Sequence, residues 1–263
     1  MKMIFERNVV NMNEYLKNVN RIEFVVTMAC TGRCKHCSEG EHIACKEHID
    51  GDVAAQAVID ICAQYKIESL MTFGGEPLLY AEDVCRIQKA AMEAGIPKRE
   101  LITNGFFSKD KYRIAEVAHM LAESGVNHIL LSVDAFHQET IPLEPVEYFA
   151  DCVRAKGIAI ELSPAWLVSK EDSNPYNVKT RELLSKFVEK GFAIANGNII
   201  WFGGNAKIHL REYFDETKEV VNPYEDDPRD VKAVSFNPNG DVLNGNIYQN
   251  DIMEIFENYH VKE

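Results

Sequence analysis

Three cysteines lie within eight positions of one another near the start of the chain, spaced C-x3-C-x2-C: Cys30, Cys34 and Cys37. Thiolate sulfur is a soft ligand that suits iron–sulfur clusters and zinc. Three cysteines are one fewer than a closed four-cysteine site needs. The fourth ligand must therefore come from elsewhere, or the fourth position is kept open for chemistry. The spacing predicts a soft-metal site and leaves both possibilities open.

The other cysteines of the seven do not extend this pattern. Cys62 lies on an apolar helical face, and Cys85 and Cys152 flank predicted helices, so we expect all three to be structural. Cys45 follows Cys37 in the same loop and could have a role near the metal site. The sequence shows no apolar run of signal-peptide or membrane-span length, which favours a cytoplasmic protein with reduced thiols and no membrane partner.

Composition and charge narrow the class of partner. The 263 residues are 46% hydrophobic and 26% charged, as in an ordinary folded protein. Acidic residues outnumber basic ones by 41 to 28, for a formal net charge of -13. Binding to a nucleic-acid backbone needs clustered Lys and Arg, so we do not expect nucleic acid as a partner.

The elements that must position the cysteines form a regular series of strand-like and helix-like segments. Beyond the first, the predicted strands lie about 30 residues apart, which is typical of βαβ units with a parallel sheet. Asp52 is expected to cap the first helix. The pattern predicts an α/β fold, a partial (βα)6 TIM-like barrel. The predicted strands are centred on Phe24, Met71, Leu101, Leu130, Ile160 and Ile194.

In such folds the binding groups lie at the C-terminal ends of the strands. Residues 21–27 form the first predicted strand and the cysteines follow directly, so we expect them on the functional face. After residue 206 an acidic connector precedes a predicted β-hairpin with an Asn-Gly turn and a closing helix. The predicted divisions are a lead-in at 1–20, a core at 21–206 and a small C-terminal extension at 207–263.

Three further motifs follow the next three predicted strands: Gly74-Gly75-Glu76-Pro77, Thr103-Asn104-Gly105 and Leu131-Ser132-Val133-Asp134. Each alone is an ordinary turn or cap. Together with the cysteines, in this order at successive strand ends, they resemble the radical S-adenosylmethionine (SAM) superfamily over about residues 20 to 205.

The resemblance implies that Cys30, Cys34 and Cys37 bind three irons of one 4Fe–4S cluster. The fourth iron is then free for the amino and carboxylate groups of SAM. No cysteine follows Cys152, so we expect no auxiliary cluster in the tail, although the tail resembles a degenerate SPASM or twitch extension. The positions implied to bind SAM are His36, Gly74, Gly75, Glu76, Asn104, Ser132, Asp134 and Ser163.

Each residue type suits its implied role. The two loop glycines lack a Cβ, so main-chain groups can approach the methionyl amine closely. Asn104 can donate to the methionyl carboxylate, and Ser132 and Asp134 can hydrogen-bond the ribose. His36 stands where the family often has an aromatic residue whose main chain meets the adenine, and Ser163 ends the fifth predicted strand.

The implied function is an enzyme that cleaves SAM reductively to a 5′-deoxyadenosyl radical, which abstracts hydrogen from a substrate. Relatives with such tails often act on peptides or ribosomal peptide precursors, so a peptide is the first expectation. A small metabolite or nucleotide is the alternative. An electron donor such as flavodoxin or ferredoxin is the implied partner.

A different class of function also fits the cysteines. Cys30, Cys34, Cys37 and a histidine could hold structural zinc in a non-enzymatic binding module.

Overall fold

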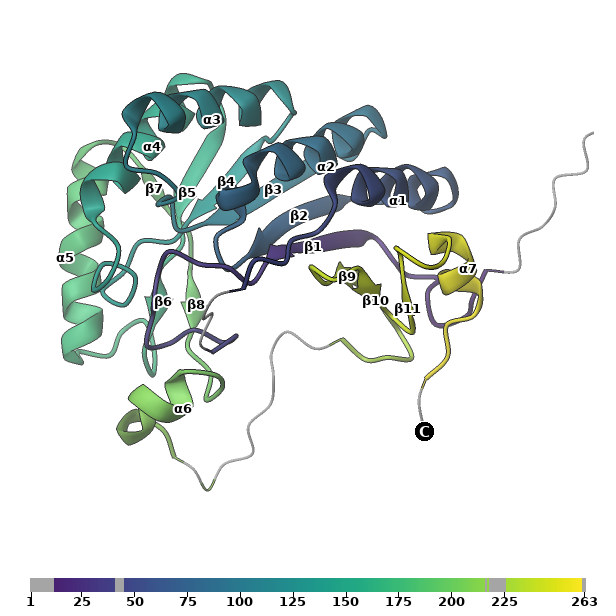
Figure 1. Ribbon diagram of the computed structural model, residues 1–263. Coiled ribbons are helices and arrows are strands. Elements are labelled where there is room, and N and C mark those ends of the chain that lie inside the picture. Colours follow the sequence, from purple (N-terminus) through teal and green to yellow (C-terminus); the bar gives the residue numbers. More distant parts are fainter. Residues whose placement is uncertain (1–11, 41–44, 216, 218–225, 262–263) are drawn as a thin grey trace, which may run out of the picture.

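The computed structural model describes residues 12–40, 45–215, 217 and 226–261. Its main sheet has nine strands in the order β11-β10-β9-β1-β2-β3-β4-β5-β7 (Figure 1). These strands are β1 (Arg21–Thr27), β2 (Ser69–Gly74), β3 (Lys98–Thr103), β4 (His128–Leu131), β5 (Ala159–Leu162), β7 (Ala193–Ile194), β9 (Ala233–Phe236), β10 (Asp241–Val242) and β11 (Gly245–Asn246). A separate pair, β6 (Ala165–Trp166) and β8 (Asn198–Ile199), lies beyond the end of β5.

The helices that connect the parallel strands alternate with them, and most of these helices lie along one face of the main sheet (Figure 1). β1 to β5 and β7 pair in parallel, which confirms the predicted α/β fold with a parallel sheet. The helices and helical turns are α1 (Gly51–Gln64), η1 (Pro77–Tyr80), α2 (Ala81–Glu93), α3 (Lys111–Glu123), α4 (Leu143–Ala155), α5 (Pro175–Glu189), α6 (Ala206–His209), η2 (Arg211–Tyr213) and α7 (Ile252–Glu257).

The two faces of the sheet differ in burial because side chains alternate along each strand. On β1, Ile22, Phe24 and Val26 are fully buried in the core that the helices cover. Arg21 and Glu23 alternate with them on the opposite face and remain partly exposed. Burial of the helix-facing side chains contributes roughly 1.5–3 kcal/mol each and holds the strand ends in place.

One predicted cap is wrong. α1 begins at Gly51, and the carboxylate of Asp50, not that of Asp52, accepts hydrogen bonds from the amides of Asp52 and Val53. Both residues are aspartates just before the apolar pattern, so their spacing alone could not choose between them.

The C-terminal segment continues the same sheet. The predicted hairpin is present as β9 and β10, which pair antiparallel through Phe236 and Val242, and α7 is the predicted closing helix. β9 also pairs in parallel with β1, and the Phe24 and Phe236 rings stack with centroids 4.5 Å apart. The C-terminal strands therefore cover the edge of β1. Residues 1–11 of the lead-in and residues 216 and 218–225 of the acidic connector lie outside the described residues.

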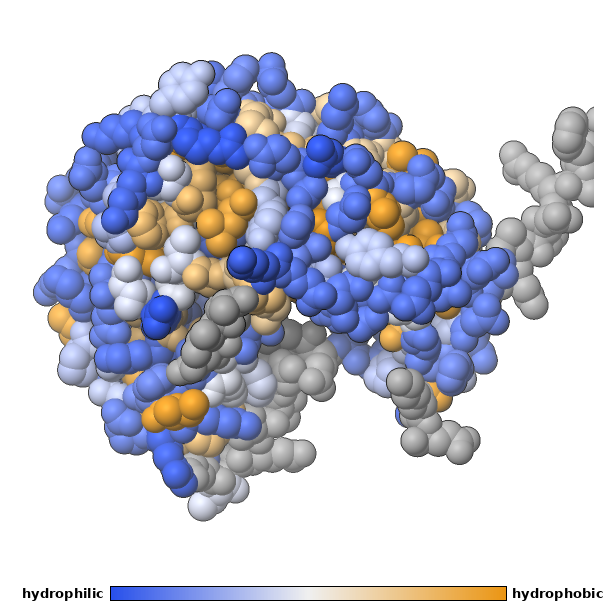
Figure 2. Space-filling model, viewed as in Figure 1, coloured by the Kyte–Doolittle hydropathy of each residue, from blue (hydrophilic) through white to orange (hydrophobic). Residues whose placement is uncertain are grey.

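Figure 2 shows a mostly hydrophilic surface, with an apolar area in the hollow bordered by α4 and α5. Among the described residues, no helix combines the length and the apolar character that crossing a bilayer requires.

Candidate metal and cofactor site

The cysteine loop leaves the C-terminal end of β1, as predicted. Cys34 is 8% exposed, Cys30 and Cys37 are half-buried, and none of the three is in a disulfide. Asn205 ties the loop to the far end of the core: its amide N–H donates to the carbonyl of Cys37 (2.9 Å) and its side chain donates to the carbonyl of Cys34 (3.1 Å). The sequence did not single out Asn205 for this contact.

The electrostatics of the loop keep two thiols protonated when no metal is bound. Burial raises the pKa of Cys30 to about 11, and the nearby charges of Glu76, Cys34 and Cys37 act in the same direction. Burial also raises the pKa of Cys37. A metal must displace these protons, since only thiolates bind it, and loading therefore releases protons.

The Gly-Gly-Glu-Pro loop packs directly against the cysteine loop. The Gly75 amide donates to the carbonyl of Thr27 (2.7 Å), and the Glu76 amide donates to that of Ala29 (2.8 Å). A Cβ at Gly75 would lie 2.2 Å from the Ala29 oxygen, and Gly74 has a φ of +138°. Both glycines are therefore required for two backbones to meet at this edge.

Glu76 joins this loop to the next motif. Its side chain is fully buried, and one carboxylate oxygen accepts from the Thr103 hydroxyl (2.7 Å) and the Leu78 amide (3.0 Å). The other oxygen accepts from the Asn104 amide (2.8 Å). Burial raises the pKa of Glu76 to about 7, although these hydrogen bonds oppose the rise. In this structure Glu76 caps η1 and links two strand ends.

Asn104 lies against the cysteine loop. Its side-chain nitrogen is 3.6 Å from the Cys30 sulfur and 3.2 Å from the Thr31 hydroxyl, and the residue is 5% exposed. Ser132 and Ser163 continue the same edge: their amides donate to the carbonyls of Thr103 and Leu131, beyond the ends of β4 and β5. Both serines are half-buried. The structure thus brings three implied SAM positions to one edge beside the cysteines.

Asp134 is placed differently. It is fully buried, and its two oxygens accept hydrogen bonds from the amides of Phe136, His137 and Ala165. The Nδ1 of His137 lies 2.8 Å from its second oxygen. Asp134 therefore holds the loop after β4 through the chain's own donors.

Two histidines flank Cys34, and the ligand atoms of Cys34, His36 and His137 all lie within 4.8 Å of one another. Burial, together with the charge of His137, lowers the pKa of His36 to about 4, and its Nδ1 is buried without a hydrogen-bond partner. Burial alone would lower the pKa of His137, but Asp134 and Cys34 outweigh it and hold that pKa well above its usual value. No motif or spacing in the sequence singled out His137.

The donor set fits an iron–sulfur cluster. Three free thiols lie on one loop at the binding edge of the sheet, with two glycines and Asn104 packed beside them. Within the described part of the chain, the group close enough to surround a single ion contains only one of the three cysteines. Thiolates are the ligands that iron–sulfur clusters use, so the three cysteines of this loop suit such a cluster by their chemistry.

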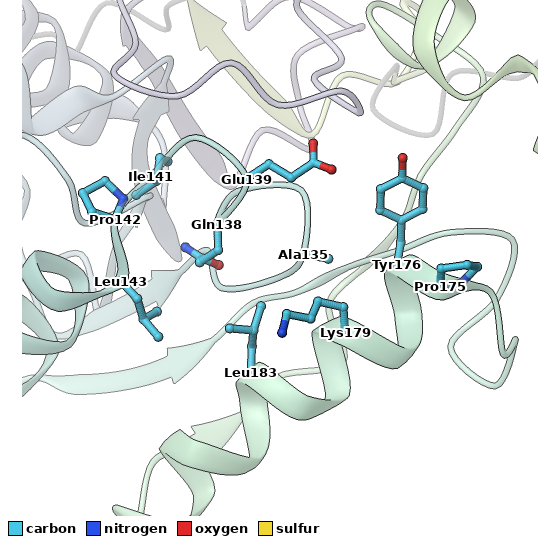
Figure 3. A pocket seen from close by; sticks show the side chains of 10 residues that line it. All are labelled: Ala135, Gln138, Glu139, Ile141, Pro142, Leu143, Pro175, Tyr176, Lys179 and Leu183. Carbon is cyan, nitrogen blue, oxygen red and sulfur yellow. The ribbon is translucent and has the colours of Figure 1, made fainter.

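A pocket of about 480 Å³ lies beside this site and contains none of the predicted site residues (Figure 3). Side chains of the loop after β4 face the first turns of α5 across it. Glu139 and Tyr176 on its rim both contact Lys35 of the cysteine loop, at 3.1 and 3.3 Å. The pocket thus adjoins the outer side of the loop.

Comparisons with known proteins agree with the predicted family. A family model described as the Radical SAM superfamily matches residues 24–163. A protein named GTP 3',8-cyclase from Desulforamulus reducens is 27% identical over 161 residues, which cover 59% of this chain and 48% of that protein. Its namesake from Alkaliphilus metalliredigens is 24% identical over 86% of this chain and 59% of its own length. The chain spans about half the length of the first of these relatives.

Solved structures share the fold. Streptococcus suis SuiB bound to precursor peptide SuiA matches with a TM-score of 0.57 at 13% identity, over 94% of this chain and 66% of SuiB. The anSMEcpe structure with bound AdoMet matches with a TM-score of 0.59 at 14% identity, over 91% and 77% of the two chains. At these identities the likeness shows the α/β architecture alone.

Proposed function

The chain belongs to the radical SAM superfamily, whose members use a 4Fe–4S cluster and SAM, and we propose that it is an enzyme that cleaves SAM reductively. The observation that carries the proposal is the linkage of the motifs at one sheet edge. Thr27 and Ala29 bond the Gly75–Glu76 loop, and Glu76 bonds the amide of Asn104. The core at 21–206 is proposed as the catalytic unit, with 207–263 as an extension that covers the edge of β1.

When bound, the cluster and SAM would supply a one-electron cleavage that yields a 5′-deoxyadenosyl radical. The chain's own part is to hold and orient these groups. Cys30, Cys34 and Cys37 would bind the irons, and Asn104 would hold the methionyl end of SAM, since its side-chain amide lies beside the Cys30 sulfur. Ser132 and Ser163 offer hydroxyls at the neighbouring strand ends.

The structure restricts how the remaining implied SAM-binding residues could contact SAM. Gly74 and Gly75 keep the edge free of side chains, so the main chain can approach the methionyl amine. Both oxygens of Glu76 and of Asp134 already accept bonds from the chain, which supports a role in fixing the edge. His36 meets the adenine through its main chain in this proposal.

For the substrate, a peptide or ribosomal peptide precursor is our first candidate, supported by the fold shared with SuiB, whose structure contains a precursor peptide. A nucleotide is the second candidate, supported by the sequence relatives named GTP 3',8-cyclase. A panel of short peptides and nucleotides distinguishes the two candidates. The class of compound that increases the formation of 5′-deoxyadenosine from SAM is the substrate class. Flavodoxin or ferredoxin is the proposed electron donor.

Metal content after anaerobic purification and reconstitution tests the proposed cluster. We expect about four iron and four sulfide per chain, with a brown colour. Cys34→Ala should lose the cluster, whereas Cys152→Ala, on the partly buried face of α4, should retain it. Loss of iron from both variants alike would contradict the assignment.

The second class of function, a zinc-binding module, is favoured by one observation: Cys34, His36 and His137 are close enough to surround a single ion. Stoichiometric zinc without sulfide, lost in His36→Ala, would support that module and reject the enzyme.

A further inference from the structure

A row of polar side chains crosses β3, β4 and β5 on the face of the sheet that points away from the helix-covered core. Its members alternate along these strands with buried core residues, so they point to the opposite face. They are Glu100, His128 and Glu161. None of the three belongs to a motif at the strand ends, and the SAM-binding site does not use them.

His128 connects the two acids of the row. Its Nδ1 lies 3.1 Å from one oxygen of Glu100, and its Nε2 lies 3.1 Å from one oxygen of Glu161. Lys98 contacts the same oxygen of Glu100 at 2.8 Å. Within the part of the chain that the structure describes, no lysine or arginine pairs with Glu161, whose side chain is 40% exposed. Glu161 therefore offers its second oxygen to a ligand.

The second oxygen of Glu100 is a further acceptor in this row. Glu100 is 2% exposed, and this oxygen is buried without a hydrogen-bond partner among the described residues. Buried polar atoms are normally hydrogen-bonded, and a charged acceptor forms its strongest bonds with a charged N–H donor. The two acids lie on either side of His128 and present acceptors to the same face. The row therefore suits a ligand with several N–H groups.

The row lies next to the edge that is proposed to bind SAM. Glu161 and Ser163 are two residues apart on the same side of one strand, so roughly 7 Å separates them along the strand direction. Leu130 pairs with Glu161 in the register of β4 and β5, and Ile102 pairs with Leu130. Both apolar side chains are half-buried. An aliphatic stem can lie over them while its charged end reaches Glu161.

We propose that this face binds a basic side chain of a peptide substrate, whose N–H groups donate to Glu161 and to the unpaired oxygen of Glu100. Arginine fits best, because its guanidinium carries five N–H donors. The inference rests on the proposed function, since it requires SAM at the neighbouring edge. It favours the peptide over the nucleotide as substrate, because carboxylates repel phosphate groups. Glu161 then selects the substrate by charge.

The test measures the binding of N-acetylarginine amide to the reconstituted protein by ligand-detected NMR titration. N-acetylcitrulline amide is the matched neutral probe, since its urea group has nearly the shape of a guanidinium without the charge. Glu161→Gln removes the charge of the carboxylate and keeps its shape. Glu189→Gln, exposed at the end of α5, is the control. Each protein is also assayed for iron and sulfide.

We expect wild type and Glu189→Gln to bind the arginine probe and to prefer it to the citrulline probe. Glu161→Gln should bind the arginine probe about 5- to 10-fold more weakly, because a hydrogen bond between two charged groups is lost. Equal affinities of wild type and Glu161→Gln for the arginine probe would overturn the inference. So would a wild type that does not prefer arginine to citrulline.

A second variant covers the case in which Glu161→Gln does not fold. Leu130→Arg places a guanidinium of the chain itself beside Glu161, so it should abolish binding of the arginine probe. Unchanged binding by this variant would overturn the inference. Guanosine that binds in a Glu161-dependent way, while the arginine probe does not bind, would also overturn it and favour a nucleotide. Wild type that holds no iron and sulfide would instead reject the proposed function.

Discussion

Glu76 is a buried acid whose proton uptake should affect folding. Its pKa in the folded protein is raised from 4.5 to about 7, so the folded state binds its proton more tightly than the unfolded state does. The contribution of this proton to the free energy of unfolding is fully present below about pH 4.5 and is lost as the pH rises through about 7.

We therefore expect metal-free wild type to lose about 3 kcal/mol of unfolding free energy relative to Glu76→Gln between pH 4.5 and 7. Urea unfolding of both proteins at several pH values measures this difference. A difference that stays constant across the range would show that folding does not raise the pKa of Glu76.

Ser132 tests the placement of SAM at the strand ends. Its hydroxyl is half-buried beyond β4, and loss of one hydrogen bond to a ligand costs about 1 kcal/mol. Ser132→Ala should weaken SAM binding by roughly 3- to 10-fold without loss of iron, as measured by calorimetry on the loaded protein. Ser185→Ala, on the exposed face of α5, is the control and should bind SAM normally.

At the residue scale, the sequence predicted the site residues that lie close together along the chain. It did not predict the contacts that the cysteine loop makes with residues far along the chain. The cysteine spacing is visible within one loop, so the metal site could be predicted. His137 and Asn205 reach Cys34 from the ends of later strands. No periodicity or spacing encodes such contacts, because they depend on how two loops fold back on each other.

At the scale of elements, the tight meeting of the two loops after β1 and β2 is the feature most sensitive to change. Gly75→Ala would place a Cβ 2.2 Å from the Ala29 oxygen, and the three atoms nearest to that Cβ all belong to the backbone of Met28 and Ala29. We expect a loss of about 1–3 kcal/mol in stability and reduced iron loading, because the cysteine loop must shift.

Gly95→Ala separates this clash from backbone strain. Gly95 has a φ of +79°, but a Cβ there would meet no atom within 4 Å. We expect it to cost about 1 kcal/mol and to leave iron loading unchanged. If Gly75→Ala also loaded iron normally, the loops would not need their close packing.

The pairing of β9 with β1 makes a second prediction at this scale. Phe236 is fully buried and stacks on Phe24, so Phe236→Ala should lower the unfolding free energy by about 3–5 kcal/mol. Ser235→Ala, on the exposed face of the same strand, removes only an exposed hydrogen bond to Glu23 and should change it by no more than about 1 kcal/mol. Denaturant unfolding compares the two, and equal stabilities would show that the C-terminal strands do not support the sheet.

The pairing of β9 with β1 could not be predicted from the sequence, although the hairpin could. The alternating residues and the Asn-Gly turn predicted a hairpin, because both signals are local. The parallel pairing of β9 with β1 joins segments about 200 residues apart, and many strand edges could have satisfied the same pattern.

For the whole molecule, the regular spacing of strands was enough to predict the fold and the edge at which the site forms. Parallel strands place their C-terminal ends together, so motifs that follow successive strands must meet. The substrate is not encoded in this way. It depends on side chains and loops at the site, which vary independently of the fold.

The central claim is that Cys30, Cys34 and Cys37 hold a cluster at which SAM is cleaved. Its most direct test is 5′-deoxyadenosine formation from SAM by the anaerobically reconstituted protein with a strong reductant, quantified by chromatography. We predict product with wild type and with Cys152→Ala, and none above background with Cys34→Ala. Iron-loaded wild type that forms no 5′-deoxyadenosine with dithionite or with reduced flavodoxin would contradict the account.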